Sequence, residues 1–270
     1  LDLVADPLGS YYGQAPASIV YLGFGVFRGV GYVASDTLFG GGGGNIAKFN
    51  KDVVAHEVGH QWWGSLINNA NNGNYWFVES LAEYSSALYV EAVNSEGGKN
   101  PAKGRKAYLD KVADWRTFLL QAGGVASVQD ATSVWGGERP GLAYVANVYN
   151  KGPYAFHILR ETFGDVKFFA FLKNLAGELK YKGIVTRDIQ RVAEQSFGGN
   201  MDWFFDQWLR GIGLPQYAFS YGVQKTEDGK YLVQGTIKQR VVVGAEKTPV
   251  PDQFYRAVIT VTAVGKDKHE

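Results

Sequence analysis

The sequence predicts an α+β fold that is mostly helical, with a small flanking β-sheet near the N-terminus and a β-rich module near the C-terminus. Three observations lead to this prediction. Aromatic and β-branched residues alternate with glycine before residue 40, apolar residues recur with helical spacing from about residue 50 to 211, and the period becomes two after residue 215. We therefore expect one larger unit over residues 1–213 and a smaller β-rich unit over residues 214–270.

The composition limits the classes of protein that need to be considered. A chain of 270 residues with 46% hydrophobic and 14% aromatic content can bury a large core. A net charge of +1 argues against a nucleic-acid partner. We also expect no membrane span, because no apolar run approaches about 20 residues, and the first residues lack the features of a signal peptide. The absence of cysteine excludes disulfides and thiolate ligands but leaves the cellular compartment open.

The N-terminal third is expected to contain the small sheet and a glycine-rich loop. Residues 11–38 are rich in Tyr, Val, Ile and Phe, which is typical of β structure beside a cleft. The run GGGGG at residues 40–44 holds no single conformation by itself. No Gly-Lys-Ser/Thr pattern follows it, so we expect a loop rather than a phosphate-binding site.

Residues 53–64, VVAHEVGHQWWG, place two histidines four residues apart, with a glutamate directly after the first. Residues four apart share one helix face, so the imidazoles of His56 and His60 can reach one zinc ion at about 2.0–2.1 Å. Glu57 points about 100° away, which suits a residue that handles the attacking water rather than a ligand. Asn50 is a candidate N-cap of this helix. The pattern predicts a zinc site; a buried helix with two hydrogen-bonded histidines is the alternative.

A catalytic zinc site needs a third protein ligand and an open position for water. After the Asn/Gly-rich turn at residues 68–74, a second helical pattern begins with YWFVESLAEY. A helix that returns from such a turn packs antiparallel to the first, so Glu79, which eighteen residues separate from His60, is the predicted third ligand. Glu83 lies one turn later on the same face, where it either accepts a hydrogen bond from a ligand imidazole or is a solvated helix residue.

These segments resemble the gluzincin zinc metallopeptidases of the aminopeptidase N and leukotriene A4 hydrolase family. The resemblance rests on HEVGHQWWG, the eighteen-residue gap and WFVESLAEY. It continues through VYNKGPYAFHILRETFGDVKFFAFLKNL and MDWFFDQWLRGIGLPQYAFSY, so that it covers roughly residues 50 to 220. It implies a thermolysin-like zinc peptidase catalytic domain over residues 1–213, followed at residues 214–270 by the start of a β-sandwich-like module.

The resemblance also implies roles for two tyrosines and a reaction. Tyr149 matches the tyrosine that donates a hydrogen bond to the oxyanion, and Tyr144 matches a second active-site tyrosine in the hydrolase branch. One zinc ion would activate a water molecule, and Glu57 would take its proton as the water attacks a peptide carbonyl. The expected partner is therefore a peptide substrate.

One upstream segment departs from the family. Its aminopeptidases carry a Gly-x-Met-Glu-Asn segment whose glutamate holds the free α-amino group of the substrate. The counterpart in this chain is GVFRGVGYV at residues 25–33, which places Arg28 at that position. Arginine repels an ammonium group and attracts a carboxylate. Three interpretations stay open: another acid binds the amine, the peptidase has an altered specificity, or substrate binding has been lost.

The C-terminal region is expected to contain strands at KYLVQGTIKQRVVV and FYRAVITVTAV. Relatives carry a large N-terminal β-domain that this sequence does not contain. We therefore expect either a fragment or a reduced member that needs a partner or a second copy, as a homo-oligomer, to cover its strand edges.

The resulting prediction is a zinc-dependent peptide hydrolase, with aminopeptidase activity implied by the resemblance. The alternatives are an endopeptidase or carboxylate-anchored hydrolase that uses Arg28, and a catalytically silent zinc-binding scaffold.

Overall fold

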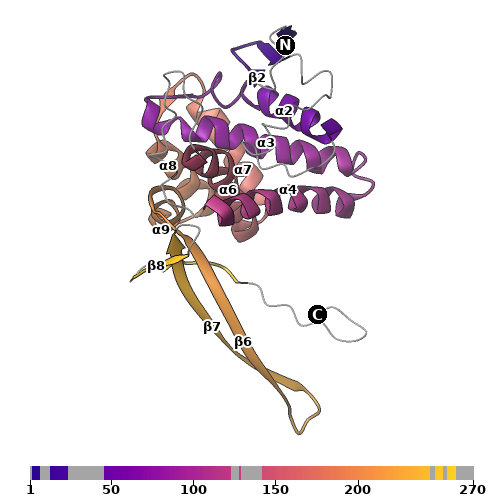
Figure 1. Cartoon of the computed structure of the whole chain (residues 1–270), viewed down its shortest axis with the longest axis vertical. Coiled ribbons are helices and arrows are strands. Elements are labelled where there is room, and N and C mark those ends of the chain that lie inside the picture. The colour runs from indigo at the N-terminus through magenta and orange to yellow at the C-terminus, as the bar shows by residue number, and fades with distance from the viewer. Residues whose placement is uncertain are drawn as a thin grey trace.

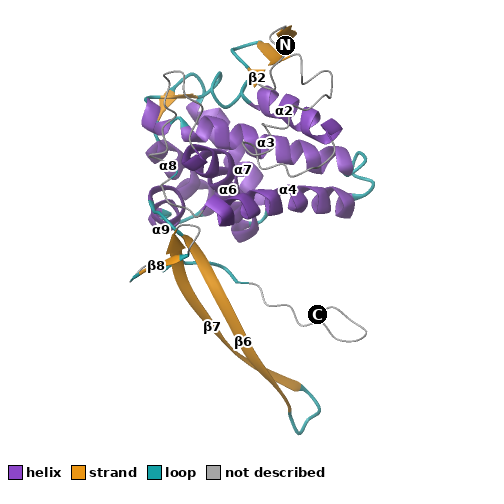
Figure 2. Cartoon of the chain, in the orientation of Figure 1, coloured by secondary structure: helices purple, strands orange, loops and turns teal. Residues whose placement is uncertain are grey.

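The helices form one body that carries strands at both of its ends. The computed structural model describes residues 2–6, 13–23, 46–122, 128, 142–243, 247–251 and 254–259. Figure 1 shows a small sheet near the N-terminus beside helix α2 (Ile46–Gly59), and a long hairpin that extends from the opposite end of the helical body. Figure 2 shows that helix dominates between them. The fold is therefore a mixture of helix and sheet, as the sequence predicts.

The N-terminal sheet has three strands among the described residues. Strand β1 (Asp2–Asp6) pairs in parallel with β3 (Ile19–Gly23), and β2 (Gly13–Gln14) pairs antiparallel with the other edge of β3. The side chains of Val20 and Leu22 are fully buried and pack near Val53 and Val54 of α2. The sheet therefore lies against the helix that carries both histidines. Residues 24–45, with Arg28 and the glycine run, lie outside the described part of the chain.

Helix α2 begins five residues earlier than the sequence predicts. Asn50 is the expected N-cap, but the helix starts at Ile46 and Asn50 lies inside it. The segment IAKF contains no proline or glycine, and alanine and lysine have high helix propensity, so the helix continues back toward the glycine run. The N-cap prediction was therefore wrong, although His56, Glu57 and His60 keep their expected helical spacing.

The helical body continues with α3 (Trp76–Asn94), which packs directly on α2. Hydrogen-bonded turns connect the two helices through the short elements β4 (Asn68–Asn69) and η1 (Asn72–Asn74). The remaining helices, in chain order, are α3 (Trp76–Asn94), α4 (Pro101–Ala122), α5 (Leu142–Ala146), the π-helix η2 (Asn147–Lys151), α6 (Gly152–Phe163), α7 (Asp165–Leu179), α8 (Thr186–Phe197), α9 (Asp202–Phe205) and the π-helix η3 (Asp206–Arg210). In the part of the chain that the structure describes, no helix combines the length and apolar character needed to cross a membrane.

A polar junction holds the start of α3 in place. Strand β4 pairs in parallel with β5 (Gly183–Ile184), which precedes α8. The Asn74 carboxamide oxygen accepts hydrogen bonds from the backbone N–H and the hydroxyl of Thr186, at 2.7 and 2.8 Å. The Trp76 indole N–H donates to the same hydroxyl at 2.9 Å. Because these groups are buried and satisfied, they fix where α3 begins.

The contact between α3 and α6 positions the segment that contains Tyr149. The hydroxyl of Ser80 donates a hydrogen bond to the carbonyl oxygen of Val148 at 2.6 Å. Next to Ser80, Gly152 has no space for a side chain. A Cβ at Gly152 would lie 2.7 Å from the Cβ of Ser80 and would overlap the Ser80 hydroxyl. The absence of a side chain at Gly152 therefore lets η2 approach α3 closely.

Replacing Gly152 with alanine should lower the free energy of unfolding. The overlap with Ser80 forces the two helices apart, and such overpacking typically costs about 1–3 kcal/mol. Gly177→Ala is the matched control, because Gly177 is also helical and a Cβ there meets nothing within 4 Å. That control should be neutral or stabilising by about 0.5–1 kcal/mol. Urea denaturation of both variants measures the difference; equal midpoints would show that the contact tolerates a methyl group.

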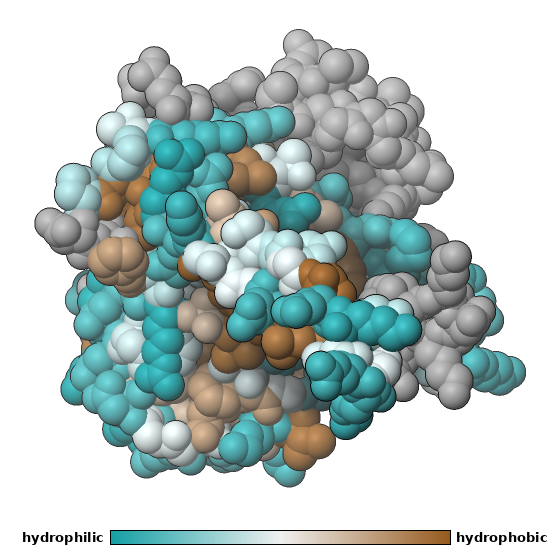
Figure 3. Space-filling view, turned by 90° about the horizontal axis from the view of Figure 1, so that it is seen from below, coloured by the Kyte–Doolittle hydropathy of each residue, from teal (hydrophilic) through white to brown (hydrophobic). Residues whose placement is uncertain are grey.

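The C-terminal part is a long hairpin with two chemically different faces. Strand β6 (Leu214–Lys225) pairs antiparallel with β7 (Tyr231–Val243), and β8 (Thr248–Val250) adds a short third strand. One face carries seven large hydrophobic residues that are 39–68% exposed: Tyr217, Phe219, Tyr221, Val223, Tyr231, Val233 and Ile237. Figure 3 views the molecule from this end and shows hydrophobic surface among hydrophilic side chains.

The strand predicted at FYRAVITVTAV is not formed in its first part. Residues 254–259 form no strand, so the prediction was wrong for these residues.

Candidate metal centre

Three side chains from α2 and α3 converge on one point. The Nε2 atoms of His56 and His60 lie 3.1 Å apart. The Glu79 carboxylate oxygen Oε2 is 3.1 Å from Nε2 of His56 and 3.4 Å from Nε2 of His60. All three residues are at most 9% exposed. The two histidines that share a face of α2 thus meet the glutamate in the first turn of α3, as the chain spacing predicts.

The other ring nitrogen of each histidine is held by a hydrogen bond. Nδ1 of His56 donates to the Glu83 oxygen Oε2 at 3.2 Å, and Nδ1 of His60 donates to the backbone carbonyl of Trp63 at 3.0 Å. When Nδ1 carries the proton, the lone pair of Nε2 is available to a metal. Both imidazoles are therefore oriented for metal binding. The role of the Trp63 carbonyl has no side-chain signal and is not visible in the sequence.

The second oxygen of Glu79 accepts a hydrogen bond from Tyr75, a residue that was not among the predicted site residues. The hydroxyl of Tyr75 donates a hydrogen bond to Glu79 Oε1 at 2.9 Å. This bond leaves Oε2 directed at the histidines, so the carboxylate offers one oxygen to a metal. Tyr75 precedes Glu79 by four residues, one helical turn, and that spacing was the available signal.

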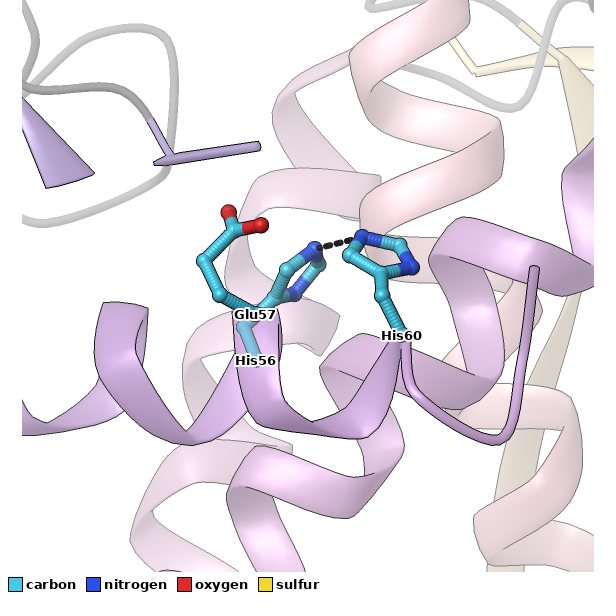
Figure 4. A group of neighbouring side chains, drawn as sticks. All are labelled: His56, Glu57 and His60. Atoms are coloured by element: carbon cyan, nitrogen blue, oxygen red, sulfur yellow. Dashed lines mark hydrogen bonds between the residues drawn. The ribbon is translucent and has the colours of Figure 1, made fainter. Parts of the chain in front are cut away.

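Glu57 lies beside this cluster without joining its hydrogen bonds. Figure 4 shows its carboxylate on the same side of α2 as the two imidazoles. The ligand atoms of His56, Glu57 and His60 all lie within 4.8 Å of one another, and Glu57 Oε2 is buried with no hydrogen-bond partner. Burial raises the pKa of the Glu57 carboxyl, whereas the two histidines oppose that rise. The shorter contacts of Glu79 favour Glu79 over Glu57 as the third ligand.

The residues present fit a single zinc ion. Ligands about 2.0–2.1 Å from a tetrahedral zinc lie about 3.3 Å apart, close to the 3.1–3.4 Å between the three ligand atoms. The orphaned oxygen of Glu57 is also the kind of group that a water molecule in the fourth position would satisfy. Burial lowers the pKa of His56, but the hydrogen bonds with Glu79 and Glu83 outweigh it and raise that pKa to about 10. The cluster therefore strongly favours a positive charge.

The two predicted tyrosines lie next to the cluster. The ring of Tyr149 stacks on that of His56 with centroids 5.9 Å apart, and Tyr144 contacts Tyr149 edge to face at 6.0 Å. Burial raises the pKa of the Tyr149 phenol well above its usual value. Tyr149 therefore stays protonated and can donate a hydrogen bond. The structure brings His56, Glu57, His60, Glu79, Glu83, Tyr144 and Tyr149 together, while Arg28 lies outside the described residues.

The opposite face of α2 has a different character. A cavity of about 700 Å³ lies between α2, α3 and α7, and Val58, Trp62 and Leu172 are among its mostly apolar lining residues. None of the clustered side chains lines it. The cavity is therefore distinct from the metal centre.

Curated relatives are similar to this chain over more than half of its length. The chain is 31% identical over 168 residues to aminopeptidase N from Lactococcus lactis subsp. lactis, an alignment that covers 60% of this chain and 19% of that protein. It is 25% identical over 180 residues to aminopeptidase B from Mus musculus, covering 62% of this chain and 26% of that protein. The chain thus spans about a fifth to a quarter of the length of these relatives.

Solved structures and a family model agree with this similarity. The M1 zinc metallopeptidase from Deinococcus radiodurans superposes with a TM-score of 0.55 at 18% identity, covering 79% of this chain and 40% of that one, so the two share a fold. A family model described as the peptidase family M1 domain matches residues 45–208, more than half of the chain. Together with the converging histidines and glutamate, this match shows that the chain belongs to peptidase family M1.

Proposed function

We propose that this chain is the catalytic part of a zinc-dependent aminopeptidase, which removes N-terminal residues from peptides. The convergence of His56, His60 and Glu79 at 3.1–3.4 Å is the observation that carries this proposal. The M1 family membership and the relatives named aminopeptidase N and aminopeptidase B support it further.

The reaction divides into a metal contribution and a protein contribution. His56, His60 and Glu79 hold the zinc ion, which when bound supplies Lewis acidity for peptide hydrolysis near neutral pH. Glu57 accepts the proton of the attacking water through its unpaired oxygen and later returns it to the leaving amine. Glu83 keeps Nδ1 of His56 protonated, and Tyr75 keeps Glu79 directed at the metal.

Tyr149 is proposed to stabilise the oxyanion of the tetrahedral intermediate. Its phenol is protonated at neutral pH because burial raises its pKa, and its ring lies against His56. Tyr144 supports the ring of Tyr149 from its edge and borders the substrate site. A buried donor that faces developing negative charge stabilises the transition state more than the ground state.

Tyr149→Phe should therefore reduce kcat and leave zinc content unchanged. Loss of one oxyanion donor typically costs about 10²–10³-fold in kcat. The matched control is Tyr181→Phe, because the Tyr181 side chain is 83% exposed, and this variant should keep its activity. Steady-state kinetics with a chromogenic amino-acid amide makes the comparison. An unchanged kcat in Tyr149→Phe would remove Tyr149 from the catalytic groups.

The division of the chain is also a proposal. Residues 1–213 would form the thermolysin-like catalytic domain and residues 214–270 the start of a β-sandwich-like module. The start of β6 at Leu214 and the exposed apolar face of the hairpin support this division, because such a face is stable when another layer covers it. That layer would come from a further β-domain, from a partner or from a second copy of the chain.

The decisive experiment is mass-spectrometric mapping of the products from a peptide pool. Free and N-blocked peptides are incubated with the protein, with and without a chelator. The proposal predicts stepwise loss of N-terminal residues from the free peptides alone, abolished by the chelator and restored by zinc. Internal or N-block-tolerant cleavage would instead assign an endopeptidase or a carboxylate-anchored hydrolase in which Arg28 sets the specificity. Zinc binding without any chelator-sensitive cleavage would indicate a silent scaffold.

A further inference from the structure

A buried lysine links the two helices that carry the metal ligands. Lys111 of α4 is 9% exposed. Its ammonium nitrogen lies 3.1 Å from an oxygen of Asp52 on α2 and 3.1 Å from Oε1 of Glu83 on α3. Asp52 is one turn before His56, and Glu83 is one turn after Glu79. Lys111 therefore contacts both ligand-bearing helices one turn away from the metal ligands.

The contacts of Glu83 are divided between its two oxygens. Oε1 receives the Lys111 ammonium and a hydrogen bond from the Trp115 indole N–H at 3.1 Å. Oε2 receives Nδ1–H of His56. With Oε1 held by two donors from α4, the carboxylate cannot rotate away from His56 without leaving a buried charge unpaired. Such a loss is costly, because an unpaired buried charge is far less stable than a paired one.

We propose that Lys111 is a positioning residue of the metal centre, which acts through Glu83 to fix the orientation and tautomer of the His56 imidazole. The inference rests on the zinc site proposed above and adds a residue from a third helix to it. Trp115 assists from the next turn of α4. Groups that orient metal-bound histidines typically change metal affinity by 10–100-fold when they are removed.

The alternative is that Lys111 only ties the helices together. In that case its loss would lower stability but would leave the zinc affinity of the folded protein unchanged. The two roles separate when zinc affinity is measured on protein that is known to be folded. They separate further in a double-mutant cycle with Glu83, because residues that act through one another give non-additive effects.

The experiment measures the zinc Kd of the metal-free full chain by competition with a chromophoric chelator, after circular dichroism has shown that each variant is folded. Lys111→Met should weaken zinc binding by about tenfold. Glu83→Gln should weaken it at least as much, and adding Lys111→Met to Glu83→Gln should change little more. Lys106→Met is the matched control: Lys106 is on the same helix, pairs with Asp110 and is exposed, so its variant should bind zinc as the wild type does.

The outcomes distinguish the inference from the function on which it rests. A wild-type chain that binds no zinc would contradict the proposed function itself. A wild-type chain that binds zinc, with Lys111→Met binding equally well or with effects that multiply in the double variant, would overturn only the role of Lys111. If Lys111→Met does not fold, Trp115→Phe replaces it, since it removes the indole donor to Glu83 and keeps an aromatic ring in the core. An unchanged zinc Kd in that variant would overturn the inference as well.

Discussion

Glu57→Gln should bind zinc as tightly as the wild type and lose peptidase turnover by roughly 10²–10⁴-fold. Glutamine has nearly the shape of glutamate but accepts no proton, so the variant removes the general base and little else. Zinc affinity should persist because His56, His60 and Glu79 make the short contacts of the cluster, whereas Glu57 Oε2 has no partner there. Metal analysis and steady-state kinetics on the same preparation test both halves of this prediction.

The control for this variant is Glu227→Gln. Glu227 is exposed in the turn between β6 and β7, at the far end of the hairpin, so its replacement should leave both zinc content and kcat unchanged. Near-normal turnover of Glu57→Gln would mean that another group takes the proton from water. Loss of zinc from Glu57→Gln would mean instead that Glu57 is a ligand, which would contradict the assignment of Glu79.

Glu79→Ala should lose most of its zinc and, as a result, its activity. Zinc held by four protein ligands is bound with about 10–16 kcal/mol, or about 3 kcal/mol for each ligand. Losing one ligand therefore weakens binding by about a hundredfold. The expected loss is larger than that of a residue that only orients a histidine, because a direct metal bond disappears. Competition with a chromophoric chelator measures the change in Kd.

Glu178→Ala controls for the loss of a helix glutamate. Glu178 is exposed on α7, where it pairs with Arg191 at the surface, and its variant should bind zinc normally. Activity in Glu79→Ala that returns at high zinc concentration would agree with a weakened site. Unchanged zinc affinity would exclude Glu79 as the third ligand. Glu57 would then be the candidate third ligand.

The sequence predicted much of the fold because its patterns are local. The helical period is strong after residue 50, and the period of two in KYLVQGTIKQRVVV marks β7. The start of α2 was misplaced because Asn50 satisfies a capping rule that the preceding helix-forming residues override. The strand predicted from Phe254 onward is absent from residues 254–259 for another reason: aromatic and β-branched residues favour a strand, but a strand forms only where a neighbour pairs with it.

The sequence by itself determined the chemistry of the metal centre, since spacing of four residues on one helix brings His56 and His60 together whatever the rest of the fold does. Only the tertiary structure decided which groups orient these ligands. Lys111 and Trp115 reach Glu83 from a helix about thirty residues further along the chain, and the Trp63 carbonyl reaches His60 through a backbone turn. Contacts between distant helices depend on packing, and packing leaves no periodic signal in a single sequence.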